Sequence, residues 1–435
     1  MHDRTRRKLC RFAFLAFCAL PTLAVVLWVG TVHSPAYSAH ERACWERLLS
    51  ERLGLIVSIA GVRHPTRGVT LFENMELKDA ETGTPIARVR RLEVGQSAGQ
   101  WILLASQPEI QGQHIWRLWE VLHERILRSR IAGGLRAQLV AGEVTIHRAH
   151  GVRASTLTDV RCRLGPAREG PQATIEFRDV ALRMAEPARL EIMRNRKVSP
   201  PATRWALQTR STALPCSLLA DQLEVLAWMG DEATFQGSVA AMPCPDGWQG
   251  ELSGRFSHVD LDQLVTERYN HKLSGTAEIV FHRARFRGGK LVDAAGEVTC
   301  SGGVVSWSLL DQAHKSLGLV ADGRVRADEA DALWQYEQLR FRFTLDGEGL
   351  RIEGRCGAPG EGIVMADRDG PLLTDRPQTV AQVVALVRAL ASESGQQVPV
   401  TPEAFQLLHV LPISKDREPV RVGPSPRIYS PLRLR

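Results

Sequence analysis

The N-terminal segment is the feature that most constrains how this chain can fold. Residues 12–32 form a run of 21 residues without a charged side chain. As an α-helix this run would extend about 31 Å, close to the hydrocarbon thickness of a bilayer. Pro21 lies within it, and membrane helices tolerate proline better than soluble helices do. The sequence therefore predicts a transmembrane anchor at residues 12–32.

The charges that flank this segment predict its orientation. Residues 1–11 carry five basic side chains and one acidic side chain, whereas residues 33–40 contain no Lys or Arg. Because Lys and Arg are enriched on the cytoplasmic side, the N-terminus is expected inside and the bulk of the chain outside the cytoplasm. The alternative is a cleaved secretion signal ending near Ala36-Tyr37-Ser38, although its apolar core would be longer than the usual length of about 7–15 residues.

The net charge of +7 does not indicate nucleic-acid binding. Much of the basic excess lies at the two ends, because residues 414–435 carry six basic and two acidic side chains. The remaining middle of the chain has a net charge of about −1. A protein that binds nucleic acid needs its basic excess on a folded face. No nucleic-acid partner is therefore expected.

The region between the anchor and residue 355 is predicted to consist mainly of short β-strands. A short helix at residues 38–52 is followed by strand patterns at residues 55–59, 69–72, 75–77, 86–94 and 101–110. Residues 115–128 return to a helical spacing. The clearest strand is residues 339–345, where Leu339, Phe341, Phe343 and Leu345 alternate with polar residues. This pattern is typical of a sheet with one apolar face and one charged face.

The predicted fold is mainly β with accessory α: an N-terminal transmembrane helix, a long meandering, groove-like β-sheet, and C-terminal helices. Residues 197–204, with Pro200-Pro201, are the predicted internal linker, and residues 403–411 are expected to form a second C-terminal helix. The predicted parts are a cytoplasmic basic flank (1–11), the anchor (12–32), an N-terminal β-rich region (38–194) with a helix near 115–128, a second β-rich region (205–355), C-terminal helices (378–411) and a disordered basic tail (414–435).

Two histidine patterns fail as metal sites. His40-Glu41 and His123-Glu124 begin the His-Glu-x-x-His pattern of metalloproteases, but positions 44 and 127 are Cys and Leu. Both histidines are predicted to be ordinary exposed helix residues. His147 and His150 are three residues apart, so in a strand their side chains would point to opposite faces.

Other candidate sites are equally weak. His258, Asp260 and Asp262 alternate, so they would share one face of a strand and could bind a cation or transfer protons. A polar strand end that leads into a helix explains them as well. The glycines from Gly347 to Gly362 lack the Gly-Lys-Ser/Thr signature of a phosphate loop and are predicted to form turns. No enzyme activity, cofactor or metal is expected.

The eight cysteines are scattered and form no Cys-x-x-Cys pair, which argues against structural zinc. Six of them lie beyond the anchor. In an oxidising compartment they could form disulfides, in any of 15 pairings. Buried free thiols are the other interpretation, and the sequence does not distinguish the two.

Residues 52–94 (RLGLIVSIAGVRHPTRGVTLFENMELKDAETGTPIARVRRLEV) resemble the N-terminal part of AsmA-like envelope proteins. Residues 256–291 are similar to the strand, short helix, strand unit of that family, and residues 296–312 and 336–354 resemble its C-terminal strands. The resemblance implies an inner-membrane anchor, a periplasmic groove-shaped β fold, and a role in phospholipid movement or outer-membrane biogenesis.

The leading hypothesis is a non-enzymatic protein that binds or transfers lipid. Acyl chains would lie along the apolar strand face, with Ile279, Phe281, Phe341, Phe343 and Leu345 as the candidate lipid-binding residues. Membrane lipid and other envelope proteins are the expected partners. The first alternative is a membrane-tethered scaffold or interaction module whose strands enclose a core. A hydrolase that uses His258, Asp260 and Asp262 is the second.

Overall fold

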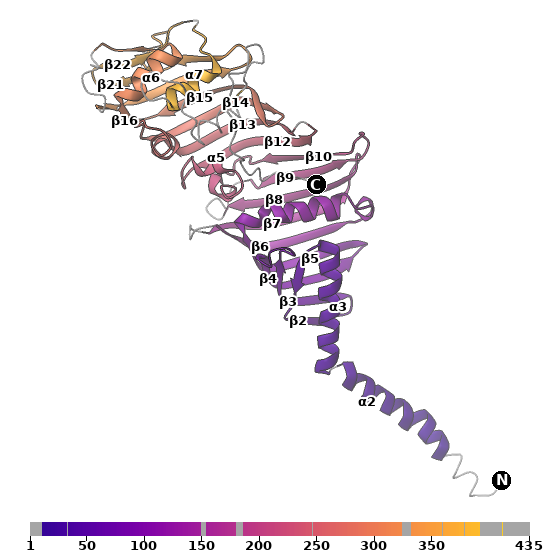
Figure 1. Ribbon diagram of the computed structural model, residues 1–435. Coiled ribbons are helices and arrows are strands. Elements are labelled where there is room, and N and C mark those ends of the chain that lie inside the picture. Colours follow the sequence, from indigo (N-terminus) through magenta and orange to yellow (C-terminus); the bar gives the residue numbers. More distant parts are fainter. Residues whose placement is uncertain are drawn as a thin grey trace, which may run out of the picture. The chain divides into compact units, whose positions relative to one another are not determined.

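The computed structural model describes residues 11–32, 34–148, 154–179, 186–245, 247–323, 332–358, 360–377, 379–391 and 411. The chain forms two compact units, Met1–Pro243 (unit 1) and Cys244–Arg435 (unit 2). Strands make up most of the regular structure of both units (Figure 1). The predicted mainly β fold, with an N-terminal apolar helix and a C-terminal helix, is confirmed.

The N-terminal apolar segment is helical, with a π-helical stretch η1 (Leu15–Ala19) followed by α2 (Leu20–Val32). Its part Arg11–Gly30 is long and apolar enough to cross a membrane, and none of it is buried against the rest of the chain. This agrees with the anchor predicted at residues 12–32. Residues 1–10, most of the predicted cytoplasmic flank, lie outside the described residues.

Helix α3 (Pro35–Leu53) follows the apolar helix. The hydroxyl of Ser34 caps it by accepting a hydrogen bond from the backbone N–H of Tyr37 at 3.2 Å, and Pro35 occupies the first turn. Gly54 ends the helix in a left-handed conformation, close to the predicted end at residue 52. The helix starts earlier than residue 38 because the serine cap and the proline precede that position.

The strands of unit 1 form an almost entirely antiparallel sheet. β3 to β5 pair as antiparallel neighbours, as do β6 to β10, and β10 pairs with β12. β1 and β2 both pair with β3, β11 pairs with β12, and β5 and β6 are parallel. The bounds are β1 (Ile56–Ser58), β2 (Gly61–Thr66), β3 (Val69–Lys78), β4 (Pro85–Ser97), β5 (Gln100–Gln111), β6 (Ala137–His147), β7 (Ser155–Pro166), β8 (Pro171–Asp179), β9 (Ala188–Asn195), β10 (Ala202–Gln208), β11 (Leu214–Pro215) and β12 (Thr234–Cys244).

The parallel pair β5 and β6 requires a crossover connection, and a helix usually supplies it. The connection contains η2 (Gly112–His114), α4 (Ile115–Glu120), the π-helical η3 (Val121–Leu127) and η4 (Ile131–Gly133). We call α4 and η3 together, residues 115–127, the strap, because they lie along one face of the sheet (Figure 1). The helix predicted at residues 115–128 is confirmed.

Residues 197–204, the predicted linker, belong to a hairpin inside unit 1. Strands β9 and β10 are antiparallel partners, and Asn195 pairs with Ala202 across the connection. The compact units divide instead after Pro243. The prediction was wrong because proline-rich composition marks a turn as readily as a linker. The short helices η7 (Cys216–Leu218) and α5 (Glu224–Ala227) lie between β11 and β12.

Strands β3 to β7 share an irregularity that we call the phase break. Asn74 in β3, Gln107 in β5 and Asp159 in β7 have φ angles of 46°, 49° and 52°, although none is glycine. A step of three residues would place side chains on opposite faces of a regular strand. Here the residues on both sides of the break join one buried cluster: Phe72 and Met75, Val89 and Leu92, and Ala141 and Val144.

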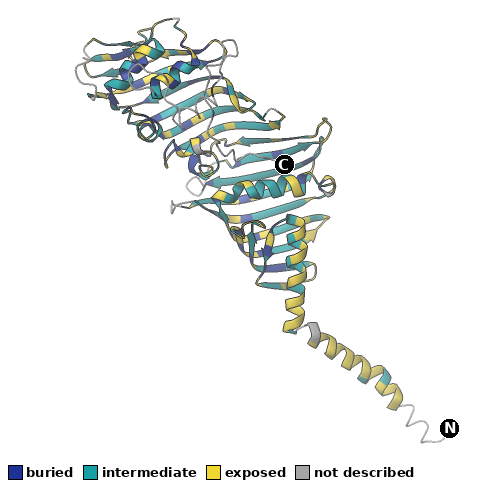
Figure 2. Ribbon diagram, in the orientation of Figure 1, coloured by how far each residue is buried: buried dark blue, intermediate teal, exposed yellow. Residues whose placement is uncertain are grey.

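The phase break explains one sequence prediction. Residues 69–72 and 75–77 were predicted as separate strands because Asn74, a residue type common in turns, lies between them. They form the single strand β3 (Val69–Lys78), whose left-handed Asn74 restores the apolar side chains to the same face. Figure 2 shows that most strand residues of the sheet are half-buried, as expected where helices cover a sheet only in part.

Unit 2 contains a second antiparallel arrangement. β13, β14, β15 and β19 pair in that order, β19 pairs with β20 and β21, and β22 pairs with β21 and β17. β16 and β18 form a separate pair. The bounds are β13 (Gly247–Asp260), η8 (Asp262–Thr266), β14 (Thr276–Arg287), β15 (Lys290–Cys300), β16 (Gly303–Ser306), α6 (Trp307–Leu317), β17 (Val320–Ala321), β18 (Leu333–Tyr336), β19 (Gln338–Leu345), β20 (Leu350–Gly354), β21 (Ile363–Asp367), β22 (Gly370–Thr374) and α7 (Val383–Ala391).

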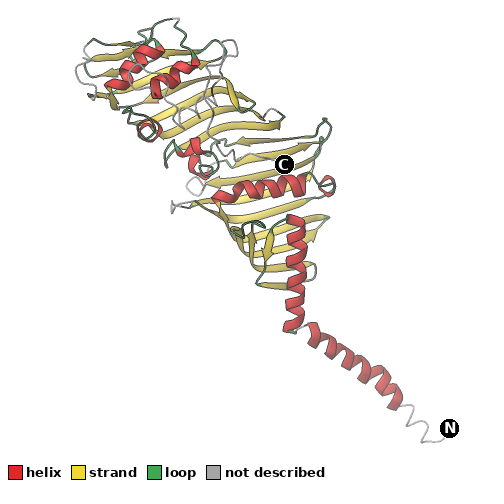
Figure 3. Ribbon diagram, viewed as in Figure 1, coloured by secondary structure: helices red, strands yellow, loops and turns green. Residues whose placement is uncertain are grey.

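Two helices of unit 2 pack against each other near the sheet (Figure 3). Residues 307–312, compared above with family strands, begin helix α6 instead, and the C-terminal helix predicted from residue 380 is α7. The second predicted C-terminal helix lies outside the described residues except for Leu411, and so does the tail at 414–435.

Candidate functional site

The five candidate lipid-binding residues lie on one face of the unit 2 sheet. Ile279 of β14 and Phe341 of β19 pair with Val298 of β15 from its two sides. One row along, Phe281 and Phe343 flank Gly296 in the same way. Leu345 pairs with Ala294 in the following row. Because alternate residues of a strand share a face, these rows form one apolar surface. We call it the apolar face of unit 2.

The middle row is closed by aromatic contacts. The rings of Phe281 and Phe343 meet edge to face with centroids 5.7 Å apart, and Phe256 meets Phe281 at 6.0 Å. Phe343 lies over Gly296, because a Cβ at residue 296 would be 2.7 Å from Phe343 Cζ and would overlap the carbonyl oxygen of Val280. Glycine at position 296 is therefore what lets the two rings approach each other.

Helix α7 covers one end of this face. Val383 and Val387 pack with Leu345 and Leu350 in a buried cluster, in which Val387 is 0% and Leu345 4% exposed. Phe281 and Phe343 lie at the margin of this cluster and are half-buried. Leu345 is thus part of a closed core. Ile279 and Phe341 lie outside the cluster and retain partial exposure.

The opposite face of the same strands is charged, as the sequence predicts. Asp293 accepts hydrogen bonds from Arg283, at 2.7 Å, and from Arg285. Arg340 of β19 donates to Glu297 of β15, also at 2.7 Å. These cross-strand ion pairs join neighbouring strands on this face. The unit 2 sheet therefore has one apolar and one ionic face.

Unit 1 also has an apolar sheet face. Trp45 of α3 meets Phe72 edge to face at 5.4 Å and covers the part of the sheet near β3. The strap covers another part, where Leu127 packs with Ala173 and Ile192. Leu103 and Phe177 pack at the edge of the buried cluster that contains Phe72, and both are only half-buried.

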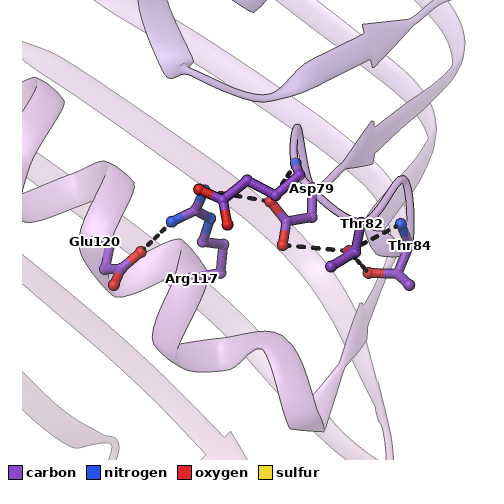
Figure 4. A network of polar contacts seen from close by, with 6 residues as sticks. Asp79, Thr82, Thr84, Arg117 and Glu120 are labelled. Carbon is purple, nitrogen blue, oxygen red and sulfur yellow. Dashed lines mark hydrogen bonds and ion pairs between the residues drawn. The ribbon is translucent and has the colours of Figure 1, made fainter. Parts of the chain in front are cut away.

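A polar network fixes the N-terminal half of the strap to the β3–β4 turn (Figure 4). Arg117 donates to Glu120 at 2.5 Å and to Asp79 at 3.2 Å. Burial tends to raise the pKa of Asp79, but hydrogen bonds from the Glu81 N–H and Thr82 and the charge of Arg117 outweigh it and lower the pKa below 3.8. Each of these groups is paired within the network, which indicates a structural role.

A second polar cluster, at the C-terminal half of the strap, was missed by sequence reasoning. His123 was predicted to be exposed, but its side chain is only 17% exposed and stacks on Trp119 with ring centroids 5.5 Å apart. Its Nε2 atom is 2.9 Å from the hydroxyl of Thr203, which is fully buried. No local motif could have revealed this pair, because its members are 80 residues apart in the sequence.

The other histidine and aspartate candidates that the structure describes are exposed or paired with neighbouring groups. Asp260 accepts the backbone N–H of Asp262 at 2.9 Å, and Asp262 pairs with Lys272. His258 is exposed at a left-handed position of β13. His147 lies 3.6 Å from Glu109, and His150 is outside the described residues. Within the described part of the chain, no cluster of His, Cys, Asp and Glu could hold a metal ion.

Free thiols are found at Cys18, Cys44, Cys162, Cys216, Cys300 and Cys356. Burial raises the pKa of Cys162 to about 11 and that of Cys216 to about 12. Burial likewise raises the pKa of Cys300 and Cys356. Thiols with raised pKa values are poor nucleophiles, and these four behave as small apolar residues.

No family model matches this chain, and a comparison with curated proteins found no match.

Proposed function

We propose that this protein is a membrane-anchored, non-enzymatic envelope protein of the AsmA-like type that binds or transfers lipid. The observation that carries the proposal is the half-buried apolar row Ile279, Val298 and Phe341. It continues the covered rows of the apolar face but lies outside the cluster beneath α7. An acyl chain laid along this row would bury its apolar surface at about 25 cal/mol per Å².

The proposed location follows from the N-terminal segment. The apolar helix would sit in the inner membrane with the basic residues 1–11 in the cytoplasm. The sheets would then lie in the periplasm, where lipid from the membrane could reach them. Envelope proteins are the proposed protein partners, and no nucleic acid is involved.

A scaffold with a closed core is the second candidate. The cluster beneath α7 supports it, because Val387 and Leu345 are buried as in an ordinary protein interior. On this view the remaining exposure of Ile279 and Phe341 is covered by a protein partner. The two candidates differ in what touches Phe341.

Site-specific photo-crosslinking separates the candidates. A benzoylphenylalanine at Phe341 or Ile279, activated in intact cells, should give an adduct with the mass of a membrane lipid. Arg342 is the matched control, since it is the next residue of β19 and is exposed. Lipid adducts at residues 341 and 279 but not at 342 would support lipid handling. Protein adducts alone would favour the scaffold, and the lipid proposal would be abandoned.

A further inference from the structure

The strap is held at both ends by side chains from other parts of unit 1 that donate to backbone carbonyl oxygens. Before α4, the side-chain amide of Gln222 donates to the carbonyl oxygens of Gly112 and Gln113, each at 3.0 Å. After η3, Arg196 donates to the carbonyl oxygens of Leu127 and Ser129 at 2.8 and 2.6 Å. Between these two attachments, η3 is held by a chain of side-chain hydrogen bonds that includes a histidine.

This chain has a defined direction. A carboxylate can only accept, so the Nδ1 of His123, 2.8 Å from Glu124, carries the proton. The Nε2 of the neutral ring then accepts from the hydroxyl of Thr203 at 2.9 Å. The oxygen of Thr203 in turn accepts from Arg194, also at 2.9 Å. We call Arg194, Thr203, His123 and Glu124 the latch.

A protonated His123 does not fit this arrangement. Its Nε2 would become a donor, and the fully buried hydroxyl of Thr203 would lose its acceptor. The positive ring would also lie 3.5 Å from the guanidinium of Arg194. The charged groups that face His123 are Glu124 and Arg128 from the strap and its end, and Arg194 from β9; Thr203 from β10 is uncharged.

We propose that the latch is a pH-sensitive fastening that releases the C-terminal half of the strap when His123 is protonated. Release would uncover the apolar residues beneath η3, which include Ile192, Ile175 and Trp205. The use of that surface for lipid rests on the proposed function, whereas the opening itself does not. The π-helical geometry of η3 is consistent with a segment that rearranges, because π-helical turns are rare and often functional.

The direction of the pH effect follows from the surroundings of the ring. Burial lowers the pKa of His123 below 6.5; the charge and hydrogen bond of Glu124 oppose this shift, and the charges of Arg194 and Arg128 add to it. A lowered pKa means that the attached state binds fewer protons than the released state. Attachment of the strap to the sheet is therefore favoured at a pH above the ordinary histidine pKa. It weakens as the pH falls through the lowered pKa of His123.

Hydrogen exchange of the full chain in detergent tests the latch. Amides of η3, residues 121–127, should exchange about three- to tenfold faster at about pH 5.5 than at about pH 7.5, after correction for intrinsic rates. Helix α7 of unit 2, which contains no histidine, is the internal reference and should not change. In His123→Gln the pH dependence of the strap should disappear. Thr203→Val should expose the strap at both pH values, whereas Thr203→Ser should match the wild type.

Two results would overturn the latch: pH-independent protection of the wild-type strap, or an equal pH response in His123→Gln. The crosslinking at Phe341 is independent of this readout. A strap that opens with acid while no lipid adduct forms leaves the latch standing and removes the lipid proposal. If lipid adducts form but the exchange of the strap does not depend on pH, the lipid proposal stands and the latch is abandoned.

Discussion

At the scale of single residues, Gly296 determines how the aromatic rings of unit 2 pack. A Cβ at this position would overlap the carbonyl oxygen of Val280 and lie 2.7 Å from Phe343 Cζ. Gly296→Ala should therefore lower the free energy of unfolding by about 1–3 kcal/mol, as overpacking does elsewhere. At Gly165 in β7, an added Cβ would have no atom within 4 Å, so Gly165→Ala should raise stability by about 0.5 kcal/mol. Denaturant unfolding of both variants gives the comparison, and equal effects would contradict it.

Asp79 is the residue whose protonation should matter most at the start of the strap. Asp79→Asn removes the charge that pairs with Arg117, and should lower the free energy of unfolding by about 1–2 kcal/mol at neutral pH. The pKa of Asp79 is lowered in the folded protein. Its contribution to the free energy of unfolding is therefore present above pH 3.8 and is lost as the pH falls through the lowered pKa. The difference between variant and wild type should shrink in acid. Asp231→Asn is the control, since this side chain is 71% exposed and its loss should cost less than about 0.5 kcal/mol.

At the scale of elements, the phase break should tolerate glycine but not a β-branched residue. Gln107 has a φ of 49°, which is strained for most side chains. Gln107→Gly should stay within about 0.5 kcal/mol of the wild type, because relief of strain offsets the added chain entropy. Gln107→Ile should lower the free energy of unfolding by about 1–2 kcal/mol. The control is Ser106→Ile, at the adjacent exposed position of the strand, which should change the free energy of unfolding by less than about 0.5 kcal/mol. If Ser106→Ile destabilised the protein as much as Gln107→Ile, the loss would come from the isoleucine side chain and not from the backbone conformation of residue 107.

The strands and helices show how much of the fold and of the candidate site could be predicted from the sequence. Alternation alone identified the apolar side of β19, because Arg340 and Arg342 separate its apolar residues. It could not distinguish Leu345, which is closed beneath α7, from Phe341, which is not, since the position of a helix on a sheet is not local. The phase break in β3 was mistaken for a turn because Asn74 is a residue type common in turns, and here its left-handed conformation lies within a strand. The latch was missed because Arg194 and Thr203 are distant from His123 in sequence.

At the scale of the whole molecule, the distribution of charge predicts which compartment holds the folded units. Residues 1–11 contain five basic side chains, whereas the eight residues 33–40 on the other side of the apolar segment contain no Lys or Arg. Such a charge difference normally keeps the basic end in the cytoplasm. Lys8→Cys and Arg255→Cys, each with Cys44→Ser, place a thiol before the helix and on the exposed side of β13. In spheroplasts, an impermeant maleimide should label residue 255 before lysis and residue 8 only after it. The native Cys10, Cys162 and Cys244 are also replaced in both variants, so that the cysteines remaining outside the apolar helix are buried and each signal reports one side. Labelling of residue 8 in intact spheroplasts would instead indicate the opposite orientation. The folded units would then lie in the cytoplasm, and the proposed periplasmic route of lipid to the apolar faces would be abandoned.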